Sequence, residues 1–280
     1  MIQSHFQKPP LGAKLNFGHP LAAGLRGCWL FNEMAGNKVL DSSGNGIHGT
    51  FSNMGAPAAA NSGWSLGPYG GGLIFDGSND TVDLGASVPF LNITTYITIS
   101  AWIYLPVSGA VGGHIFGNNG NLAYRFRIVS GSPASLNFLD RGATNQIAST
   151  SQLVLGQHYH VGVTGSPQGL KLYINGRLDI SNAVAFGGGT GGQCNIGSIS
   201  TYGEFLNGFI DNLYIYNRCL SAPEVAMLYN NPFIMFAQKE QYEVTAAGWP
   251  IKLSPDEMMS VATMDQPKWK SGNYRMFLTF

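Results

Sequence analysis

The chain has 280 residues, of which only 11% are charged, and its fifteen basic residues balance its fifteen acidic ones. This composition provides no broad electrostatic field for nucleic acid or an anionic membrane. It also contains no uninterrupted apolar run of about 18 residues, the length that a membrane-spanning helix needs. With 38 glycines and 12% aromatic residues, the composition favours a turn-rich protein built from β-sheets.

Residues 1–20 begin with a polar stretch that lacks the apolar core of a signal peptide. Pro9, Pro10, Gly12 and Gly18 interrupt this segment, and such residues break regular structure. The sequence therefore predicts an extended N-terminal arm rather than a packed element.

The three cysteines, Cys28, Cys194 and Cys219, lie far apart in the sequence. Their spacing matches no common set of metal ligands. We expect them to be small buried side chains.

Between residues 27 and 197, short apolar segments with a period of two alternate with turn-forming residues. Asn175 and Gly176 give the strongest hairpin signal. Residues 41–50 are dense in turn-forming residues, and residues 55–72, rich in Ala, Gly, Ser and Pro, predict a covering loop. The expected strands, hairpins included, are 27–33, 73–84, 97–105, 113–117, 123–129, 135–140, 158–164, 170–179 and 194–197. Many short strands of this kind predict an antiparallel two-sheet sandwich.

Residues 206–229 predict a long strand followed by a short helix. The period-two alternation places Phe209, Asp211, Leu213 and Ile215 on one face and Ile210, Asn212, Tyr214 and Tyr216 on the other. Ser221 and Glu224 have the spacing of a capping box, which marks the start of a helix. Val225, Leu228 and Tyr229 then form one apolar stripe on that helix.

After residue 236 the strand pattern ends. Residues 237–280 carry scattered charges together with large apolar side chains: Trp249, Trp269, Tyr274, Phe277 and Phe280. A purely solvating linker has few such residues. The sequence thus predicts an arm (1–20), a sandwich domain (21–236) and a docking or oligomerisation tail (237–280).

Two formal catalytic motifs lack the structural context that their chemistry requires. Residues 63–67 spell G-x-S-x-G, but no helix follows, as the turn of a nucleophile elbow demands. Residues 187–192 contain G-x-G-x-x-G outside any βαβ unit, so we expect a flexible loop.

The titratable side chains do not form a recognisable active site either. His158 and His160 share a strand face and could present two imidazoles to a metal, but no third ligand is near in sequence. We expect them to face solvent or a loop. Asp76, Asp80 and Asp83 flank a tight turn, where Asp side chains bond the backbone. The chain lacks the paired-carboxylate strand of glycosidases with this kind of fold, so we predict no enzyme.

A carbohydrate site combines a stacking aromatic ring with a few polar groups. Trp64, Tyr69, Tyr124 or Tyr202 could supply such a ring from loops. Aromatic residues are so frequent in this chain, however, that most must belong to the core or to subunit contacts.

Several segments, taken in order, resemble the laminin-G-like, concanavalin A-like jelly-roll family. They are residues 27–33 followed by 41–46, then 75–80, 100–103, 160–164 leading to 172–176, 208–211 and 220–224. The resemblance covers roughly residues 21–236 and implies an all-β, two-sheet antiparallel jelly roll with one short helix. The flanks at 10–12, 18–25 and 231–236 are similar to those of such domains in tailed-phage structural proteins.

Many members of this family hold a structural calcium ion. The resemblance implies a Ca²⁺ site formed by Asp41, the loop around Asn45, and Asp211 from the closing strand. Carboxylate and carbonyl oxygens suit this ion. The alternative is that Asp41 makes an Asx-turn and Asp211 bonds loop amides, with no ion bound.

The family consists mostly of binding and assembly modules, which leaves two hypotheses open. In the first, the chain is a non-enzymatic virion structural protein, a capsid decoration, fibre or tail appendage subunit at the particle surface. It would form a homo-oligomer and dock on other virion proteins through its terminal segments. In the second, it is a lectin-like module that binds carbohydrate on a host or another surface.

Overall fold

The computed structural model describes residues 8–55, 61–86, 88–107, 112–119, 124–131, 133–140, 145–189, 191–199, 204–236, 242–246 and 249–253. The chain divides into two compact units, Met1–Phe236 and Ala237–Phe280. Within the described ranges, no helix has both the length and the apolar character needed to cross a bilayer.

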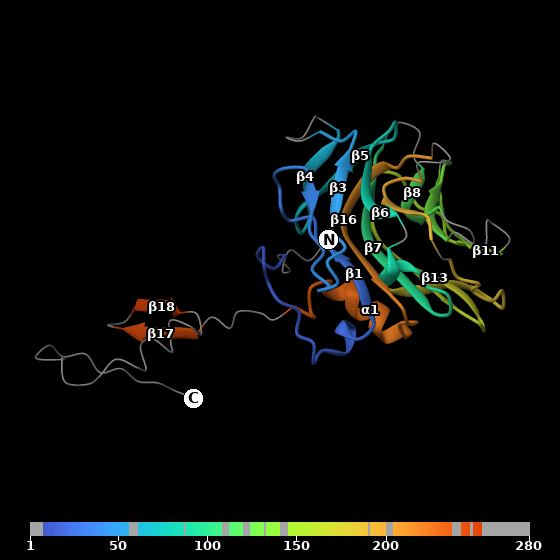
Figure 1. Ribbon diagram of the computed structural model, residues 1–280. Helices are drawn as coiled ribbons and strands as arrows, with labels where there is room; N and C mark the ends of the chain where they lie inside the picture. Colours follow the sequence, from blue (N-terminus) through green and yellow to red (C-terminus); the bar gives the residue numbers. More distant parts are fainter. Residues whose placement is uncertain are drawn as a thin grey trace, which may run out of the picture. The chain divides into compact units, whose positions relative to one another are not determined.

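The first unit is a sandwich of two antiparallel sheets (Figure 1). In the described residues, the first sheet contains, in spatial order, β14 (Arg177–Asn182), β13 (Gly169–Ile174), β12 (Gln157–Ser166), β7 (Ile97–Leu105), β16 (Asn207–Tyr216), β5 (Gly70–Asp76) and β4 (Gly63–Gly67). The strand β1 (Leu25–Trp29) also pairs with β16. The second sheet contains β11 (Asn145–Ala148), β10 (Ser135–Asp140), β9 (Arg125–Val129), β8 (Gly113–Asn118), β15 (Gln193–Ile196), β6 (Thr81–Ala86), β3 (Gly49–Ser52) and β2 (Lys38–Val39). The predicted all-β sandwich is therefore confirmed.

The main core lies between the two sheets. Alternate residues of β7, such as Ile99, Ala101 and Ile103, join buried side chains such as Phe116 and Phe138 of the second sheet. This is the period-two pattern that the sequence displays. Burial of these apolar surfaces is the main force that holds the sheets together.

A second buried cluster covers the outer face of the first sheet. Trp102, Tyr214 and Tyr216 project from this sheet against residues from both ends of the unit. These residues include Leu15, Leu21, Val225, Leu228, Phe233, Met235 and Phe236. The covering elements include the short 3₁₀ helix η1 (Pro20–Ala22) and the helix α1 (Ala222–Asn230).

The N-terminal segment is packed, so the prediction of an extended, unpacked arm is wrong for residues 8–20. Leu15 is buried and forms a β-bridge with Phe236. The Asn16 backbone N–H donates to the Met235 carbonyl at 2.9 Å. The turn-forming residues do interrupt regular structure here, but apolar side chains between them, such as Leu15, still pack against the outer cluster.

Two local predictions are confirmed. At the start of α1 both halves of the capping box are present, because Ser221 accepts from the Glu224 amide and Glu224 accepts from the Ser221 amide. At the β13–β14 hairpin, Asn175 and Gly176 have φ values of 51° and 74°, the positive pair that a type I′ turn requires.

Residues 63–67 and 70–72, in contrast, form strands rather than the predicted covering loop. Glycines occur in these strands for a steric reason. A Cβ atom at Gly72 would overlap the Phe209 ring, and one at Gly67 would lie 2.5 Å from it. The glycines therefore provide room for an aromatic ring that lies across β4 and β5.

The strand β16 departs from simple alternation at Asp211. The pairing with β7 shifts register between Ile210 and Asn212, which is a β-bulge. As a result Ile210, Leu213 and Ile215 all reach the core between the sheets. The predicted division into two faces is therefore wrong across this point, because the extra residue reverses the alternation.

The second unit contains the described hairpin of β17 (Tyr242–Ala246) and β18 (Trp249–Leu253). These two strands pair in antiparallel register, with Tyr242 opposite Leu253.

Candidate functional site

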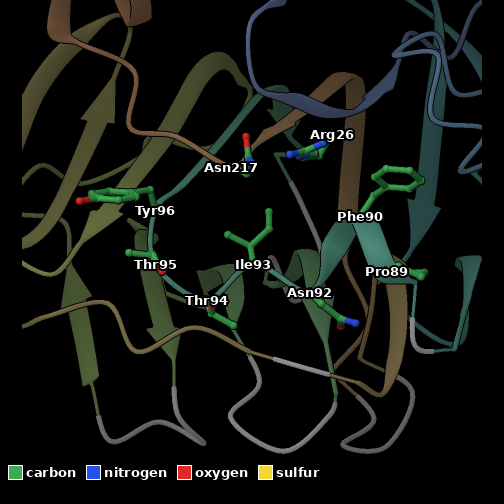
Figure 2. A pocket seen from close by; sticks show the side chains of 9 residues that line it. All are labelled: Arg26, Pro89, Phe90, Asn92, Ile93, Thr94, Thr95, Tyr96 and Asn217. Atoms are coloured by element: carbon green, nitrogen blue, oxygen red, sulfur yellow. The ribbon is translucent and has the colours of Figure 1, made fainter.

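A surface pocket of about 540 Å³ lies beside the connection between β6 and β7. This connection contains the 3₁₀ helix η2 (Pro89–Leu91) and continues through Tyr96. Arg26 from β1 and Asn217, which follows β16, complete the lining (Figure 2). The volume falls within the range of small-molecule sites, roughly 300–1,000 Å³.

Two aromatic side chains border this pocket. Figure 2 shows Phe90 and Tyr96 on opposite sides, with Ile93 between them. Both rings are 44% exposed, whereas Ile93 is 4% exposed and belongs to the core. The buried Ile93 thus gives the pocket an apolar floor, while Phe90 and Tyr96 remain accessible to a ligand.

The polar side of the pocket is the guanidinium of Arg26, which Asn217 holds in place. With the Asn217 amide in the orientation that satisfies both of its ends, its oxygen accepts from Arg26 Nη2 at 2.5 Å and from Nε at 3.2 Å, while its nitrogen donates to the Gly24 carbonyl at 3.1 Å. The Arg26 Cζ atom lies 5.9 Å from the centre of the Phe90 ring. The charged donor therefore lies over the Phe90 ring.

The Gly-rich segment after residue 186 supports this pocket from behind. The Gly189 N–H donates to the Ile93 carbonyl at 3.0 Å, and the Gly191 N–H donates to Asn92 Oδ1 at 2.9 Å. Gly188 has a φ of +75°, and a Cβ atom there would overlap the backbone of Thr94. The glycines thus allow close backbone contact with the β6–β7 connection.

We expect Gly188→Ala to destabilise the unit by about 2–4 kcal/mol, from the positive φ and from overpacking against Thr94. Gly36→Ala is the matched control, because Gly36 has a φ of +70° and a Cβ atom added there would meet nothing within 4 Å. Urea denaturation of both variants separates the two causes. Equal losses would show that the contact with Thr94 is unimportant.

Asp41, a predicted calcium ligand, is saturated by donors. Its Oδ1 accepts from the amides of Cys28 (3.0 Å) and Ser43 (2.8 Å), and its Oδ2 accepts from Ser43 Oγ (2.7 Å) and the Ile47 amide (3.0 Å). A carboxylate offers about four lone-pair positions. Asn45 directs its Nδ2 donor at the carbonyls of Leu25 and Arg26.

Asp211, the third predicted ligand, has a different partner. Its Oδ1 lies 2.8 Å from the ammonium of Lys8, and both side chains are buried. Among the described residues, no hydrogen bond or ion pair joins the Asp211 side chain to Asp41 or Asn45. The donor set around these three residues therefore does not fit one shared calcium ion.

The prediction that His158 and His160 both face solvent or a loop is wrong for His160. Its side chain is 1% exposed, its Nε2 lies 2.8 Å from Ser100 Oγ, and its ring packs near Trp102 and Tyr229. Burial lowers the pKa of His160 to about 3. The reason is the outer layer of terminal residues and α1, which covers this face of the sheet.

The acidic side chains of the β5–β6 turn bond the backbone, as expected. Asp80 Oδ2 accepts from the Asp76 amide, Asp76 accepts from the Ser78 amide, and Asp83 accepts from the Gly85 amide. Burial raises the pKa of Asp80, whose Oδ1 accepts from Ser62 Oγ. Their oxygens are engaged in shaping the turn.

A charged group that the sequence did not reveal lies at β8 and β9. Glu204 Oε2 is 3.0 Å from Arg127 Nη1 and 3.3 Å from His114 Nε2. Burial lowers the pKa of His114 to about 4. The β8–β9 pairing places His114 opposite Arg127, and Glu204 reaches both from the segment that precedes β16.

The aromatic residues proposed as sugar-stacking candidates do not line the pocket. Trp64, Tyr69 and Tyr124 are buried, and Tyr202 lies outside the described residues. The sequence did not single out Phe90 or Tyr96. The available signal was their position in a turn-rich connection between two strong strands.

Comparison with known proteins agrees with this architecture. A laminin G family model, described as the concanavalin A-like lectin/glucanases superfamily, matches residues 76–226. No protein with a curated function matches the chain. Similar solved structures include domain 4 of AbnA, a GH43 extracellular arabinanase from Geobacillus stearothermophilus, in complex with arabinotriose. That domain is 19% identical, with a TM-score of 0.56, over 73% of this chain and 98% of its own.

Two further structures have the same fold in longer proteins. The binding domain of Paraclostridial Mosquitocidal Protein 1 is 17% identical with a TM-score of 0.57, over 81% of this chain and 59% of its own. Trypanosoma rangeli sialidase in complex with 2,3-difluorosialic acid is 17% identical with a TM-score of 0.57, over 84% of this chain and 37% of its own. At these identities the likeness shows a shared fold alone. The family match covers more than half of the sequence, and the chain belongs to the concanavalin A-like lectin/glucanase superfamily.

Proposed function

We propose that this chain is a non-enzymatic module that binds carbohydrate in the pocket between Phe90 and Tyr96. The observation that carries the proposal is the pair of exposed rings beside a guanidinium held by Asn217. An aromatic face packs against the apolar face of a sugar ring, and a fixed donor pairs with its hydroxyl or carboxylate oxygens. The arabinotriose bound to the similar AbnA domain supports this choice of ligand class.

The test is a glycan array followed by calorimetry on the best ligand. We expect Tyr96→Ala to weaken binding at least tenfold, which corresponds to about 1.4 kcal/mol of lost contact energy. Phe17→Ala is the control, because Phe17 is an aromatic side chain that is 75% exposed and lies outside the pocket lining. A blank array, or equal binding by both variants, would contradict the proposal.

A second role, as a virion structural subunit at a particle surface, concerns the second unit. The support is that the described part of this unit contains a two-stranded hairpin, an element that gains stability by packing on a partner. We infer that this hairpin packs on another copy of the chain or on another virion protein. Mass spectrometry of purified particles tests the inference, and absence of the chain from them would contradict it.

A further inference from the structure

The ammonium of Lys8 is enclosed by oxygen atoms from three separate parts of the first sheet. It donates to the carbonyls of Leu30 (2.5 Å), Asp211 (2.5 Å) and Gly71, and it pairs with Asp211 Oδ1 at 2.8 Å. We call these four oxygens the oxygen cage. The Lys8 side chain is 4% exposed and that of Asp211 is 1% exposed, so bulk water solvates neither charge.

The cage exists because β16 changes partners along one edge. Its pairing with β5 ends at Ile210, and its pairing with β1 begins at Leu213. The bulge at Asp211 falls in the gap between these two pairings. Carbonyls that neither strand can satisfy would be costly when buried, and Lys8 supplies the missing hydrogen bonds.

The backbone of Lys8 and Pro9 is also held by hydrogen bonds. The Lys8 N–H donates to the Tyr69 carbonyl at 3.3 Å, and the Pro9 carbonyl accepts from Asn32 Nδ2 at 2.7 Å. The ammonium therefore enters the cage from a defined direction and acts as a tethered ion. Because the ammonium is attached to the chain, its effective concentration at the cage is high, and a free ion must compete with it.

The chemistry of the cage is that of a site for a hard cation. It consists of neutral carbonyl oxygens and one carboxylate, the oxygen types that Ca²⁺ prefers. Burial lowers the pKa of Lys8 and raises that of Asp211, and the attraction between the two groups opposes both shifts. Glu33 adds a second negative charge close enough to act on Lys8.

We propose that the oxygen cage is a cation site whose resident cation is the ammonium of Lys8, and that Ca²⁺ enters it only when this side chain is removed. The N-terminal segment thereby takes the place of an exchangeable metal ion. This assignment does not depend on the carbohydrate-binding proposal, because the cage shares no residue with the pocket lining.

The experiment measures Tm for the full-length chain and its variants with EDTA or with 10 mM CaCl₂. Lys8→Ala empties the cage and leaves space, whereas Lys8→Met removes the charge but fills most of the volume. We expect both variants to melt well below the wild type in EDTA, because each leaves the Asp211 carboxylate buried and unpaired. Calcium should raise the Tm of Lys8→Ala by about 3 °C or more, and should change the wild type and Lys8→Met by less than about 1 °C.

Two results would overturn the proposal. If CaCl₂ stabilises the wild type as much as Lys8→Ala, the lysine is not the resident cation. If CaCl₂ leaves Lys8→Ala unchanged, the cage is not a cation site. Binding of Tb³⁺, followed through emission sensitised by the nearby Tyr69, provides a second readout of occupancy in the same three proteins.

The double variant Lys8→Ala, Asp211→Asn keeps the test decisive if Lys8→Ala does not fold without calcium. Removing both charges leaves no unpaired ion, so we expect the double variant to melt above Lys8→Ala and to show no response to calcium. A double variant that melts below Lys8→Ala in EDTA, or that responds equally to calcium, would contradict the assignment of Asp211 as the anion of the site.

Discussion

Replacement of Asp41 by Ala should destabilise the first unit by about 3–5 kcal/mol. Each buried donor that loses its charged acceptor costs about 1–3 kcal/mol, and hydrogen bonds to water offset only part of this cost. The affected donors are the amides of Cys28, Ser43 and Ile47 and the hydroxyl of Ser43. For a unit of this size the loss corresponds to a fall in Tm on the order of 10 °C. Differential scanning calorimetry measures it directly.

Asp179→Ala is the matched control for this variant. Asp179 also accepts two backbone N–H groups, those of Thr150 and Ser151, but at an exposed site. Water can replace the carboxylate there, so we expect a loss of about 1 kcal/mol or less. Similar losses in the two variants would show that the loop around Asp41 does not depend on its buried carboxylate.

Acid should destabilise the chain strongly through His160. The folded state holds its pKa at about 3, from an ordinary value of 6.5, because burial disfavours the charged imidazolium. Between these pH values the unfolded state binds one more proton than the folded state. The free energy of unfolding therefore has its full value above about pH 6.5. It decreases by on the order of 4 kcal/mol as the pH falls towards 3.

The measurement is the free energy of unfolding in urea at several pH values from 7.5 to 4. In His160→Asn, which cannot titrate, we expect the slope against pH to fall by about one proton relative to the wild type. His158→Asn is the control, because His158 is only partly buried and its slope should change less. An unchanged slope in His160→Asn would contradict the assigned protonation state.

The sequence predicted the fold well where a single local rule determines the structure. The alternation in β7, the Asn175-Gly176 turn and the Ser221–Glu224 capping box each depend on neighbouring residues, and each was confirmed. The rule failed at Asp211, because a bulge depends on where partner strands begin and end. It failed again at residues 63–72, because glycines that accommodate the Phe209 ring look like loop residues when the ring is unknown.

The candidate site was less accessible to sequence reasoning. The pocket joins Arg26, Phe90 and Asn217 from three distant segments, and nothing in their local spacing shows that they meet. His160 was misassigned because the layer that buries it comes from the two ends of the unit. The sequence placed Asp211 on the closing strand, where the structure also has it. No sequence pattern indicated that its carboxylate would pair with Lys8.

The pairing of β1 with β16 has a consequence for synthesis of the chain. The first strand cannot find its partner until residues 213–216 have been made, roughly 10–40 s later at ordinary elongation rates. Until then β7 and β5 also lack the neighbour that separates them, so their unpaired edges are open to wrong pairing. Completion of the domain therefore depends on its last strand, and translation that stops before Tyr216 would release a chain prone to aggregation.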